Sequence, residues 1–429
     1  MKQGGPGSFD PAVRRMLLIL LVVYVFNFLD RQIVNILAEP ISRDLKLSDT
    51  EIGLMTGLAF ALFYTVLGIP IARHADLPST DRSRLIAISL AIWSAMTALC
   101  GLAQNYTQLL LARIGVGVGE AGCTPAAHSL IADRVSPERR ASAMAFYAIG
   151  IPLGSLLGMV IGGQLADLVG WRGAFMFVGL PGLLLVFVVL LLVRDKERIA
   201  SAAHQGAAGS VWQTMRRLLG STTFVMLLAA ASASSFLSYG KSTWTAIFYQ
   251  RTHHLTPGEV GFWYGLLTGL AGVAGTWIGG QLADRLGRNH ITTAPALGMA
   301  LAIPMALASY QAPDWRLSMA LLMVPTLLNS LYYGPVYAST QGLVPQHQRA
   351  MASALLLFCQ NLIGLGLGPL FFGMLSDWIK PTFGEASVRY VLYGAAWLGL
   401  IPALLYWLLR PRLAAEIEGK VAAVEQVSG

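Results

Sequence analysis

Gly163-Gln-Leu-Ala-Asp167 ends one long apolar run of this sequence, and the identical string Gly280-Gln-Leu-Ala-Asp284 ends another. Gly373-Met-Leu-Ser-Asp377 has the same pattern 210 residues after the first copy. A second pair of strings shows a matching offset, because the last arginines of Pro137-Glu-Arg-Arg140 and Pro345-Gln-His-Gln-Arg349 are 209 residues apart. The chain therefore contains two related halves in parallel.

A shorter repeat lies within each half. Gly68-Ile-Pro-Ile-Ala72 begins 95 residues before Gly163, and Gly280 lies 93 residues before Gly373. Repeats nested in this way are typical of secondary transporters, in which each half is a pair of inverted three-helix repeats.

Composition indicates a membrane protein. Of the 429 residues, 55% are hydrophobic and only 12% are charged, which is more apolar surface than a soluble domain could bury. The apolar runs match the roughly 20 residues that a spanning helix needs, and they are too long and uniform for barrel strands. We predict an all-α membrane protein with twelve transmembrane helices, at 16–38, 50–72, 85–103, 108–134, 141–166, 172–193, 222–249, 257–283, 290–309, 316–341, 349–376 and 388–409.

The spans form two groups of six around the longest polar segment. We predict six-helix bundles at 1–193 and 221–429, joined by a charged, solvated linker at 194–220. The first apolar run is span-length and continues into an intramembrane Asp-Arg pair, so we expect it to remain as a helix and not to be cleaved as a signal.

Positive charge indicates the orientation. With a cytoplasmic N-terminus, 20 of the 30 Lys and Arg residues fall in cytoplasmic segments, 7 in external loops and 3 inside spans. The positive-inside rule then places both termini in the cytoplasm. The net charge of +8 follows this topology and is not gathered on one face, so we expect no nucleic-acid partner.

No pattern indicates a metal, a cofactor or an enzyme. The three cysteines, Cys100, Cys123 and Cys359, lie in spans without ligand spacing and are interpreted as packing residues. The glycine-rich stretch at 115–119 resembles the start of a dinucleotide loop, but no strand precedes it. His128 and Ser129 are adjacent and cannot form a relay with each other. We therefore expect no enzyme activity.

Ionisable residues inside the spans are the main candidates for function, because each costs at least ~2.5 kcal/mol at mid-depth. They are Asp30, Arg31, Arg113, Glu120 and Lys241. Asp30 follows Arg15 by 15 residues and Glu120 precedes Arg134 by 14, so both acids lie about 21 to 22 Å from the cytoplasmic end.

Two acids at one depth suit a proton site, because burial favours the protonated form of a carboxyl and alternating exposure can load and unload a proton. The alternative is a static ion pair, either Asp30 with Arg113 or Glu120 with Arg31. Both interpretations hold together if the pair breaks on protonation.

Polar residues continue at helical spacing on the first span of each three-helix repeat. In a lipid-embedded bundle such polar stripes must face protein or a water-filled cavity. We predict proton coupling by Asp30 and Glu120, and substrate binding by Asn27, Arg31, Arg113, Lys241, Tyr333 and Tyr337.

Two motifs resemble the major facilitator superfamily. Gly280-Gln-Leu-Ala-Asp-Arg-Leu-Gly-Arg288 resembles its cytoplasmic signature between the eighth and ninth spans. Gly150-Ile-Pro-Leu-Gly154, continuing to Gly163, resembles its fifth-span signature associated with antiporters. The resemblance extends over essentially the whole chain and implies the major facilitator fold, with two six-helix bundles of 3+3 inverted repeats.

Within that superfamily, Asn27-Phe-Leu-Asp-Arg31 together with Arg113-Ile-Gly-Val-Gly-Val-Gly-Glu-Ala121 resembles the spinster branch. This resemblance implies a proton-linked carrier of lysolipids or sphingoid phosphates. Asp30, Arg31, Arg113 and Glu120 are the positions that match.

The first half departs from the superfamily's gate pattern. Ala72 stands where an acid is expected, and the sequence leaves open whether Asp76 replaces that acid. Asp133 at the end of its span is expected to form a network with Arg139 and Arg140. The cytoplasmic gate is assigned to the charged residues at these helix ends: Asp76, Asp133, Arg139, Arg140, Asp284, Arg285 and Arg288.

These observations predict a secondary active transporter that works by alternating access, with the proton as coupling ion. Its expected substrate is an amphipathic molecule of the lysolipid or sphingoid-phosphate kind. Two alternatives stay open, which are proton-coupled symport or antiport of small organic anions or drugs, and a non-transporting sensor on the same fold. We expect a monomer in the plasma membrane, or the inner membrane of a bacterium, surrounded by the lipid bilayer.

Overall fold

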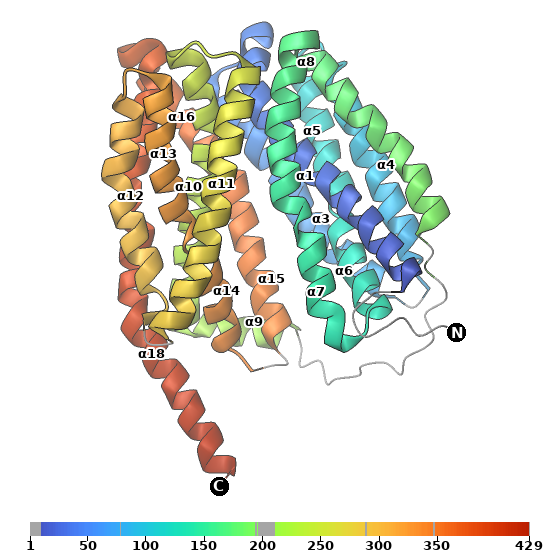
Figure 1. The fold of residues 1–429 in the computed structure, drawn as a ribbon, viewed down its shortest axis with the longest axis vertical. Coiled ribbons are helices and arrows are strands. Elements are labelled where there is room, and N and C mark those ends of the chain that lie inside the picture. The colour runs from blue at the N-terminus through green and yellow to red at the C-terminus, as the bar shows by residue number, and fades with distance from the viewer. Residues whose placement is uncertain are drawn as a thin grey trace. The chain divides into compact units, whose positions relative to one another are not determined.

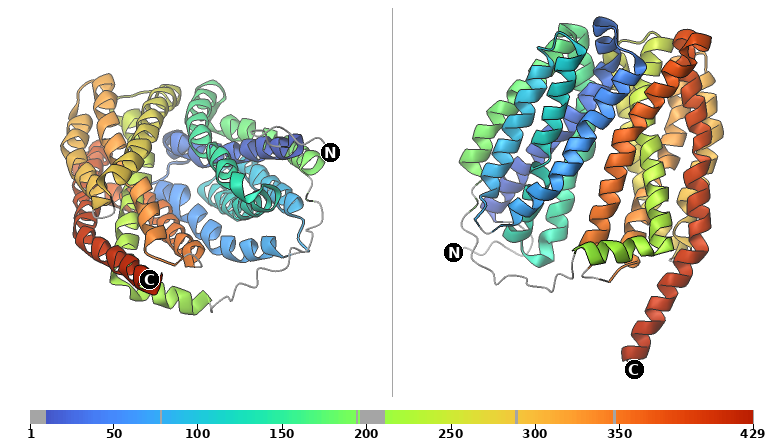
Figure 2. Two further views of the ribbon diagram at one scale, coloured as in Figure 1. Left: turned by 60° about the horizontal axis from the view of Figure 1, so that its bottom comes forward. Right: turned by 180° about the vertical axis from the view of Figure 1, so that it is seen from behind.

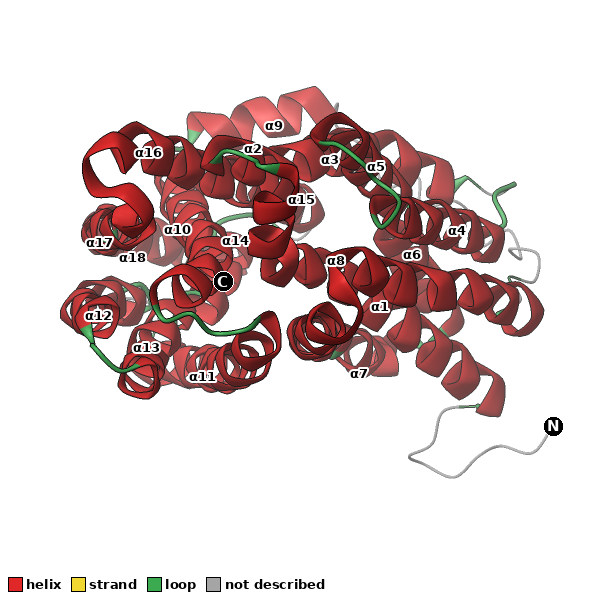
Figure 3. Cartoon of the chain, turned by 90° about the horizontal axis from the view of Figure 1, so that it is seen from above, coloured by secondary structure: helices red, strands yellow, loops and turns green. Residues whose placement is uncertain are grey.

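The computed structural model of the protein describes residues 10–77, 79–193, 195, 211–287, 290–345 and 348–428. These residues form helices and short connections, with no strand among them (Figure 3). The all-α prediction is confirmed.

The chain divides into two compact units (Figure 1). Unit 1 comprises residues 1–204 and 256–265, and unit 2 comprises residues 205–255 and 266–429. Residues 196–210 of the predicted linker lie outside the described residues. The helix α11 therefore begins in unit 1 and continues in unit 2.

Unit 1 contains helices that match the first six predicted spans. In chain order they are α1 (Pro11–Leu45), α2 (Asp49–Gly53), the π-helix η1 (Leu54–Leu58), α3 (Ala59–Asp76), α4 (Arg82–Cys100), α5 (Tyr106–Glu120), α6 (Cys123–Arg134), α7 (Pro137–Ala148) and α8 (Gly150–Leu192).

Unit 2 begins with a short helix from the linker and contains the other predicted spans. Its helices are α9 (Val211–Gly220), α10 (Thr222–Thr252), α11 (Pro257–Leu286), α12 (Thr293–Gln311), α13 (Trp315–Ser330), α14 (Tyr333–Gly342), α15 (Arg349–Cys359), the π-helix η4 (Gln360–Leu367), α16 (Gly368–Phe383), the short 3₁₀ helix η5 (Gly384–Ala386), α17 (Ser387–Leu398) and α18 (Leu400–Ser428). Among the described residues, eight stretches are long and apolar enough to cross a membrane, and the longer ones hold more than one predicted span.

Side-chain caps explain where several helices begin. Asn105 accepts a hydrogen bond from the backbone N–H of Gln108 at the start of α5. Ser48 and Glu51 form a reciprocal capping box at the start of α2. Such caps satisfy backbone donors that a helix leaves unpaired at its first turn.

Gly170 lies between the fifth and sixth predicted spans, which α8 contains together. Its backbone has φ 73° and ψ 170°, so the helix changes direction there without a loop. A residue with a side chain rarely adopts this conformation, whereas glycine adopts it at little cost.

Glycines of α8 bring it close to α1. A Cβ atom on Gly154 would lie 2.4 Å from the carbonyl oxygen of Val25, and one on Gly158 would lie 2.7 Å from that of Leu29. Small residues at four-residue spacing permit this close approach in membrane bundles. The packing fixes α1, which carries half of the intramembrane charges of unit 1.

Asp167, the last residue of the first Gly-Gln-Leu-Ala-Asp string, caps the start of α11 within unit 1. Its carboxylate accepts hydrogen bonds from Thr256 Oγ1 at 2.8 Å and from the backbone N–H of Gly258 at 3.0 Å. An acid at a helix N-terminus is favoured by the free N–H groups and the helix dipole.

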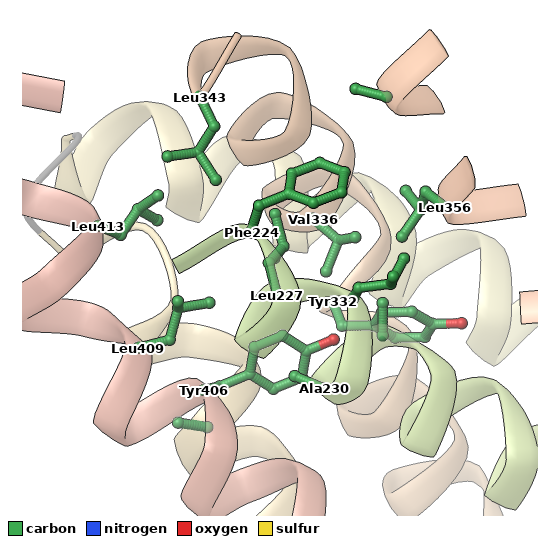
Figure 4. Packing of buried hydrophobic residues seen from close by; sticks show 14 of the residues in the cluster. Phe224, Leu227, Ala230, Tyr332, Val336, Leu343, Leu356, Tyr406, Leu409 and Leu413 are labelled. Atoms are coloured by element: carbon green, nitrogen blue, oxygen red, sulfur yellow. The ribbon is translucent and has the colours of Figure 1, made fainter. Parts of the chain in front are cut away.

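Unit 2 is held by a hydrophobic core at one end of its helices. Phe224 of α10, Val336 of α14 and Leu409 of α18 pack there with a buried tyrosine, Tyr406 (Figure 4). Leu218 anchors α9 in the same core, and α9 runs across the ends of its neighbours in unit 2 (Figure 2).

Candidate functional site

The intramembrane charges of unit 1 gather between α1 and α5. Asp30, Arg113 and Glu120 are each at most 2% exposed, and the side chain of Arg31 is 13% exposed. Arg31 Nε donates a hydrogen bond to Glu120 Oε2 at 2.7 Å. Of the two ion pairs left open by the sequence, the structure contains the one between Arg31 and Glu120.

Aromatic rings surround the guanidinium of Arg31. Its carbon Cζ lies 5.0 Å from the ring centroid of Phe28, 5.1 Å from that of Phe60 and 4.4 Å from that of Tyr64. Ring faces attract a cation and exclude water from it. Arg31 is therefore held by three rings and one carboxylate, and it is the most exposed of the four charged residues.

Asp30 is held by a residue that the sequence analysis did not single out. Thr97 of α4 donates a hydrogen bond from Oγ1 to Asp30 Oδ2 at 3.1 Å. Thr97 is fully buried in a span with no charge inside it, so its spacing gives no signal in the sequence. Phe60 and Tyr64 were missed for a similar reason, because aromatic residues are common in apolar helices.

Several buried polar atoms around these charges have no hydrogen-bond partner. They are both side-chain atoms of Asn27, Oδ1 of Asp30, Nε and Nη1 of Arg113, and Oε1 of Glu120. More than nine in ten buried polar groups in folded proteins are paired, so open donors and acceptors are rare. Their concentration here is typical of a place that takes up water, a proton or a ligand.

The other predicted binding residues belong to unit 2. Lys241 lies on α10 and is partly buried. Tyr333 begins α14, where its ring centroid lies 4.2 Å from that of Tyr332. Tyr337 follows one turn later with 37% of its surface exposed. The predicted substrate residues thus fall into two groups, one in each unit.

Asp133 of the predicted gate is bound by an arginine that the sequence analysis missed. Arg82 at the start of α4 donates from Nη1 to Asp133 Oδ2 at 2.5 Å, and also binds both carboxylate oxygens of Asp195 at 2.8 and 2.9 Å. Arg82 is 2% exposed. This Arg82 cluster, comprising Arg82, Asp133 and Asp195, joins the start of α4 to the ends of α6 and α8.

The pKa of Asp195 reflects this cluster. Burial alone would raise the pKa of the carboxyl, but the hydrogen bonds and the charge of Arg82 outweigh burial and hold it below its ordinary value. Asp195 is therefore ionised at neutral pH and acts as a permanent partner of Arg82.

The remaining gate residues lie at helix ends. Arg139 is partly buried and Arg140 is exposed on α7, while Asp284 and Arg285 are exposed at the end of α11. Asp76 is the last residue of α3. Arg288 lies outside the described residues.

Comparison with known proteins identifies the family. The model of the Major Facilitator Superfamily matches residues 20–369. The chain belongs to this superfamily. It is a multi-pass integral membrane transporter of the major facilitator fold and not an enzyme, as the sequence predicted.

Relatives of this superfamily member include exporters and spinster proteins. It is 37% identical to an MFS-type efflux pump of Mycolicibacterium smegmatis over 406 residues, which are 93% of each chain. It is 26% identical to protein spinster homolog 1 of Rattus norvegicus, covering 86% of this chain and 74% of the rat protein.

A solved structure supports the same branch. The crystal structure of a bacterial homolog of the human lysosomal transporter spinster, inward-facing and unoccupied, matches with a TM-score of 0.87 and 29% identity. The match covers 96% of this chain and 99% of that one. The spinster-like branch predicted from Asn27–Arg31 and Arg113–Ala121 is thus confirmed.

Proposed function

We propose that this transporter couples proton movement to the transport of an amphipathic molecule with an anionic head group, such as a lysolipid or a sphingoid phosphate. The observation that carries the proposal is the buried group of two acids and two arginines in unit 1, with several polar atoms left unpaired. The efflux-pump relative supports outward transport. The amphipathic substrate is what the resemblance to the spinster branch implies.

In this proposal Arg31 binds the head group. Its guanidinium is partly exposed, and a planar fork of donors matches a phosphate or carboxylate. Glu120 competes for the same guanidinium through its bond at 2.7 Å. An anion that takes Arg31 displaces Glu120, whose displaced carboxylate can accept a proton.

Asp30 is proposed as the second proton site. It is buried, held by Thr97 through one oxygen, and left with a free oxygen that can accept a proton. Lys241, Tyr333 and Tyr337 are proposed as the contribution of unit 2 to substrate binding, and Asn27 as a polar neighbour of the acids in unit 1.

Topology belongs to the same proposal. We place both termini in the cytoplasm on the basis of the positive charge in the segments that share a side with the termini. We also expect a monomer in a plasma membrane. Protease digestion of an N-terminal tag in right-side-out vesicles tests this placement, because a tag that is cleaved from outside contradicts it.

Flux measurements test the coupling. In proteoliposomes with an imposed pH gradient, Glu120→Gln and Asp30→Asn are each expected to abolish gradient-driven uptake of a fluorescent lysophosphatidic acid, because a neutral isostere cannot exchange a proton. Asp44→Asn on the same α1, whose side chain is 46% exposed, is the matched control and is expected to stay coupled. A full response of either site variant to the gradient would remove that residue from the coupling.

A second candidate function is transport of a small organic anion. The chain is 27% identical, over 284 residues and 63% of its length, to a probable L-galactonate transporter of Escherichia coli. Competition separates the two candidates, since excess galactonate is expected to leave lysophosphatidic acid flux unchanged if the amphipathic substrate is correct.

A further inference from the structure

Arg113 is a buried guanidinium that the proposed binding step does not use. It is 1% exposed, and its Nε and Nη1 have no hydrogen-bond partner. Each buried donor left unpaired costs about 1–3 kcal/mol, and more on a charged group. Arg31, by contrast, donates from Nε to Glu120 and lies against three rings.

Arg113 lies on the same helix as the acid that Arg31 holds. It precedes Glu120 by seven residues on α5, which is about two helical turns and places both side chains on one stripe. One ring joins the two arginines, because Phe60 lies 5.1 Å from Arg31 Cζ and 5.5 Å from Arg113 Cζ. The charge of Arg113 acts on both Glu120 and Asp30.

One carboxylate oxygen of Glu120 is available for a second hydrogen bond. Its Oε2 accepts from Arg31, while Oε1 is buried without a partner. A buried carboxylate that loses its only counter-ion is costly by about 3–5 kcal/mol. A second buried guanidinium with unpaired donors in unit 1 would offset much of that cost.

We propose that Arg113 is the alternative counter-ion of Glu120, to which the carboxylate turns when an anion takes Arg31. This inference rests on the proposed function for the identity of that anion. The change of counter-ion from Arg31 to Arg113, called the hand-over below, depends only on the residues of unit 1. It makes head-group binding possible with Glu120 still ionised, so that proton uptake follows binding and is not a condition for it.

The other charged and titratable groups around this pair limit the alternatives. The other titratable groups coupled to Glu120 or to its partner Arg31 are Tyr24, Asp30, Tyr64 and Cys123, of which a tyrosine or cysteine carries charge only when it loses its proton. None of these is a cation, so within the part of the chain that the structure describes Arg113 is the second positive charge acting on Glu120.

A substrate-free experiment tests the hand-over. Arg31→Ala removes the first counter-ion, and infrared spectroscopy at pH 7 reads the C=O stretch of a protonated carboxyl, assigned by its loss in Glu120→Gln. We expect no such band in Arg31→Ala, because Arg113 keeps Glu120 ionised. We expect the band to appear in Arg31→Ala/Arg113→Gln and to vanish again in Arg31→Ala/Arg113→Lys.

The control and the opposing results are specific. Arg31→Ala/Arg172→Gln removes a positive charge of the same unit, 41% exposed on α8, and is expected to show no band. A band in Arg31→Ala alone, or its absence from the Arg31→Ala/Arg113→Gln variant, would overturn the hand-over. If that variant does not fold, the thermal stability of Arg31→Ala/Arg113→Lys tests the proposal instead. If Arg113 acts as a counter-ion, lysine can replace it, and this variant is expected to be about as stable as Arg31→Ala. If Arg113 is needed only for its shape and packing, the lysine variant is expected to be less stable.

Binding of dodecyl sulfonate, whose charge does not change between pH 6 and pH 8, separates this inference from the proposed function. The affinity of wild type is expected to change less than twofold between pH 6 and pH 8, whereas Arg113→Gln is expected to bind at least tenfold more weakly at pH 8 than at pH 6. Failure of wild type to bind any amphiphilic anion would refute the proposed substrate, while the infrared result would still decide the role of Arg113.

Discussion

Replacement of Arg82 by glutamine is expected to destabilise unit 1 strongly. Arg82 is 2% exposed and forms a double hydrogen bond with Asp195, whose side chain is 6% exposed. Without the guanidinium, Arg134 at 4.0 Å is the cation paired with Asp195 among the described residues. Removing one partner of a buried ion pair costs about 3–5 kcal/mol, because the other charge stays buried.

Most of this cost arises at Asp195 and little at Asp133. The side chain of Asp133 is 40% exposed, so water replaces its partner and the pair contributes at most about 1 kcal/mol. Asp195→Asn is expected to cost less than Arg82→Gln, because the amide oxygen still accepts a hydrogen bond. The double variant is expected to be more stable than the sum of the single changes by about 0.5–3 kcal/mol.

Thermal unfolding of the detergent-solubilised protein measures the effect. For a cooperative unit of roughly 150–250 residues, each kcal/mol lowers Tm by about 2–4 °C, so the expected decrease for Arg82→Gln is roughly 6–20 °C. Arg84→Gln is the matched control, because Arg84 is 77% exposed and paired with an exposed acid. A change of less than about 1 °C in Arg82→Gln, or an equal change in both variants, would refute the reasoning.

The pH dependence of this difference has a defined sign. The pKa of Asp195 is lowered in the folded protein, so its contribution to stability is complete above the pKa of the unfolded chain, near about 3.9, and is lost as pH falls through the folded value. The Tm difference between wild type and Arg82→Gln is therefore expected to be fully present at pH 7. It is expected to shrink below about pH 4.

Three further predictions follow from the other features. Arg31→Ala is expected to weaken dodecyl phosphate binding in calorimetry more than Arg31→Lys, and equal affinities in both variants and wild type would exclude a head-group role. Because Ala72 replaces an acid of the cytoplasmic gate, closure on that side is weakened by about 1 kcal/mol and the resting protein is expected to favour the inward-open state. Asp284→Asn should strengthen this bias, and Ala72→Asp should weaken it. Distances between spin labels on α6 and α14 measure the bias, and distances that respond to neither substitution would contradict this role of the gate. Gly154→Val places side-chain atoms against a carbonyl of α1 and is expected to destabilise the protein by about 1–3 kcal/mol in thermal unfolding. Gly68→Ala is the control and should not lower Tm, because nothing lies within 4 Å of a Cβ atom at that position. A similar decrease of Tm in both variants would argue against close packing at Gly154.

The depth of the intramembrane charges could be predicted because a helix has a fixed rise. Counting from Arg15 and Arg134 placed Asp30 and Glu120 at one level, and the structure buries both acids. The choice between two ion pairs depended on side-chain direction, which spacing alone does not determine. The structure contains the pair of Arg31 with Glu120.

Contacts between distant segments could not be predicted. Arg82 and Asp195 are 113 residues apart, and Thr97 and Asp30 are 67 apart, with no periodicity that links them. Gly170 also gave no sign that the fifth and sixth spans are joined at a single kink, because a glycine between apolar runs equally predicts a loop. These features depend on tertiary packing, which a single sequence records only indirectly.

The balance of charge in unit 1 has an electrical consequence. Asp30 and Glu120 carry as much negative charge as Arg31 and Arg113 carry positive charge, so the empty group is neutral when all four are ionised. Moving one elementary charge through a membrane potential of 100 mV changes the energy by about 2.3 kcal/mol, and a neutral group has no such change. The rate at which the empty carrier returns should then be independent of membrane voltage, except for the contribution of the charge on Lys241. Presteady-state currents that disappear in Lys241→Met would locate the voltage sensitivity of the cycle in a single side chain of unit 2.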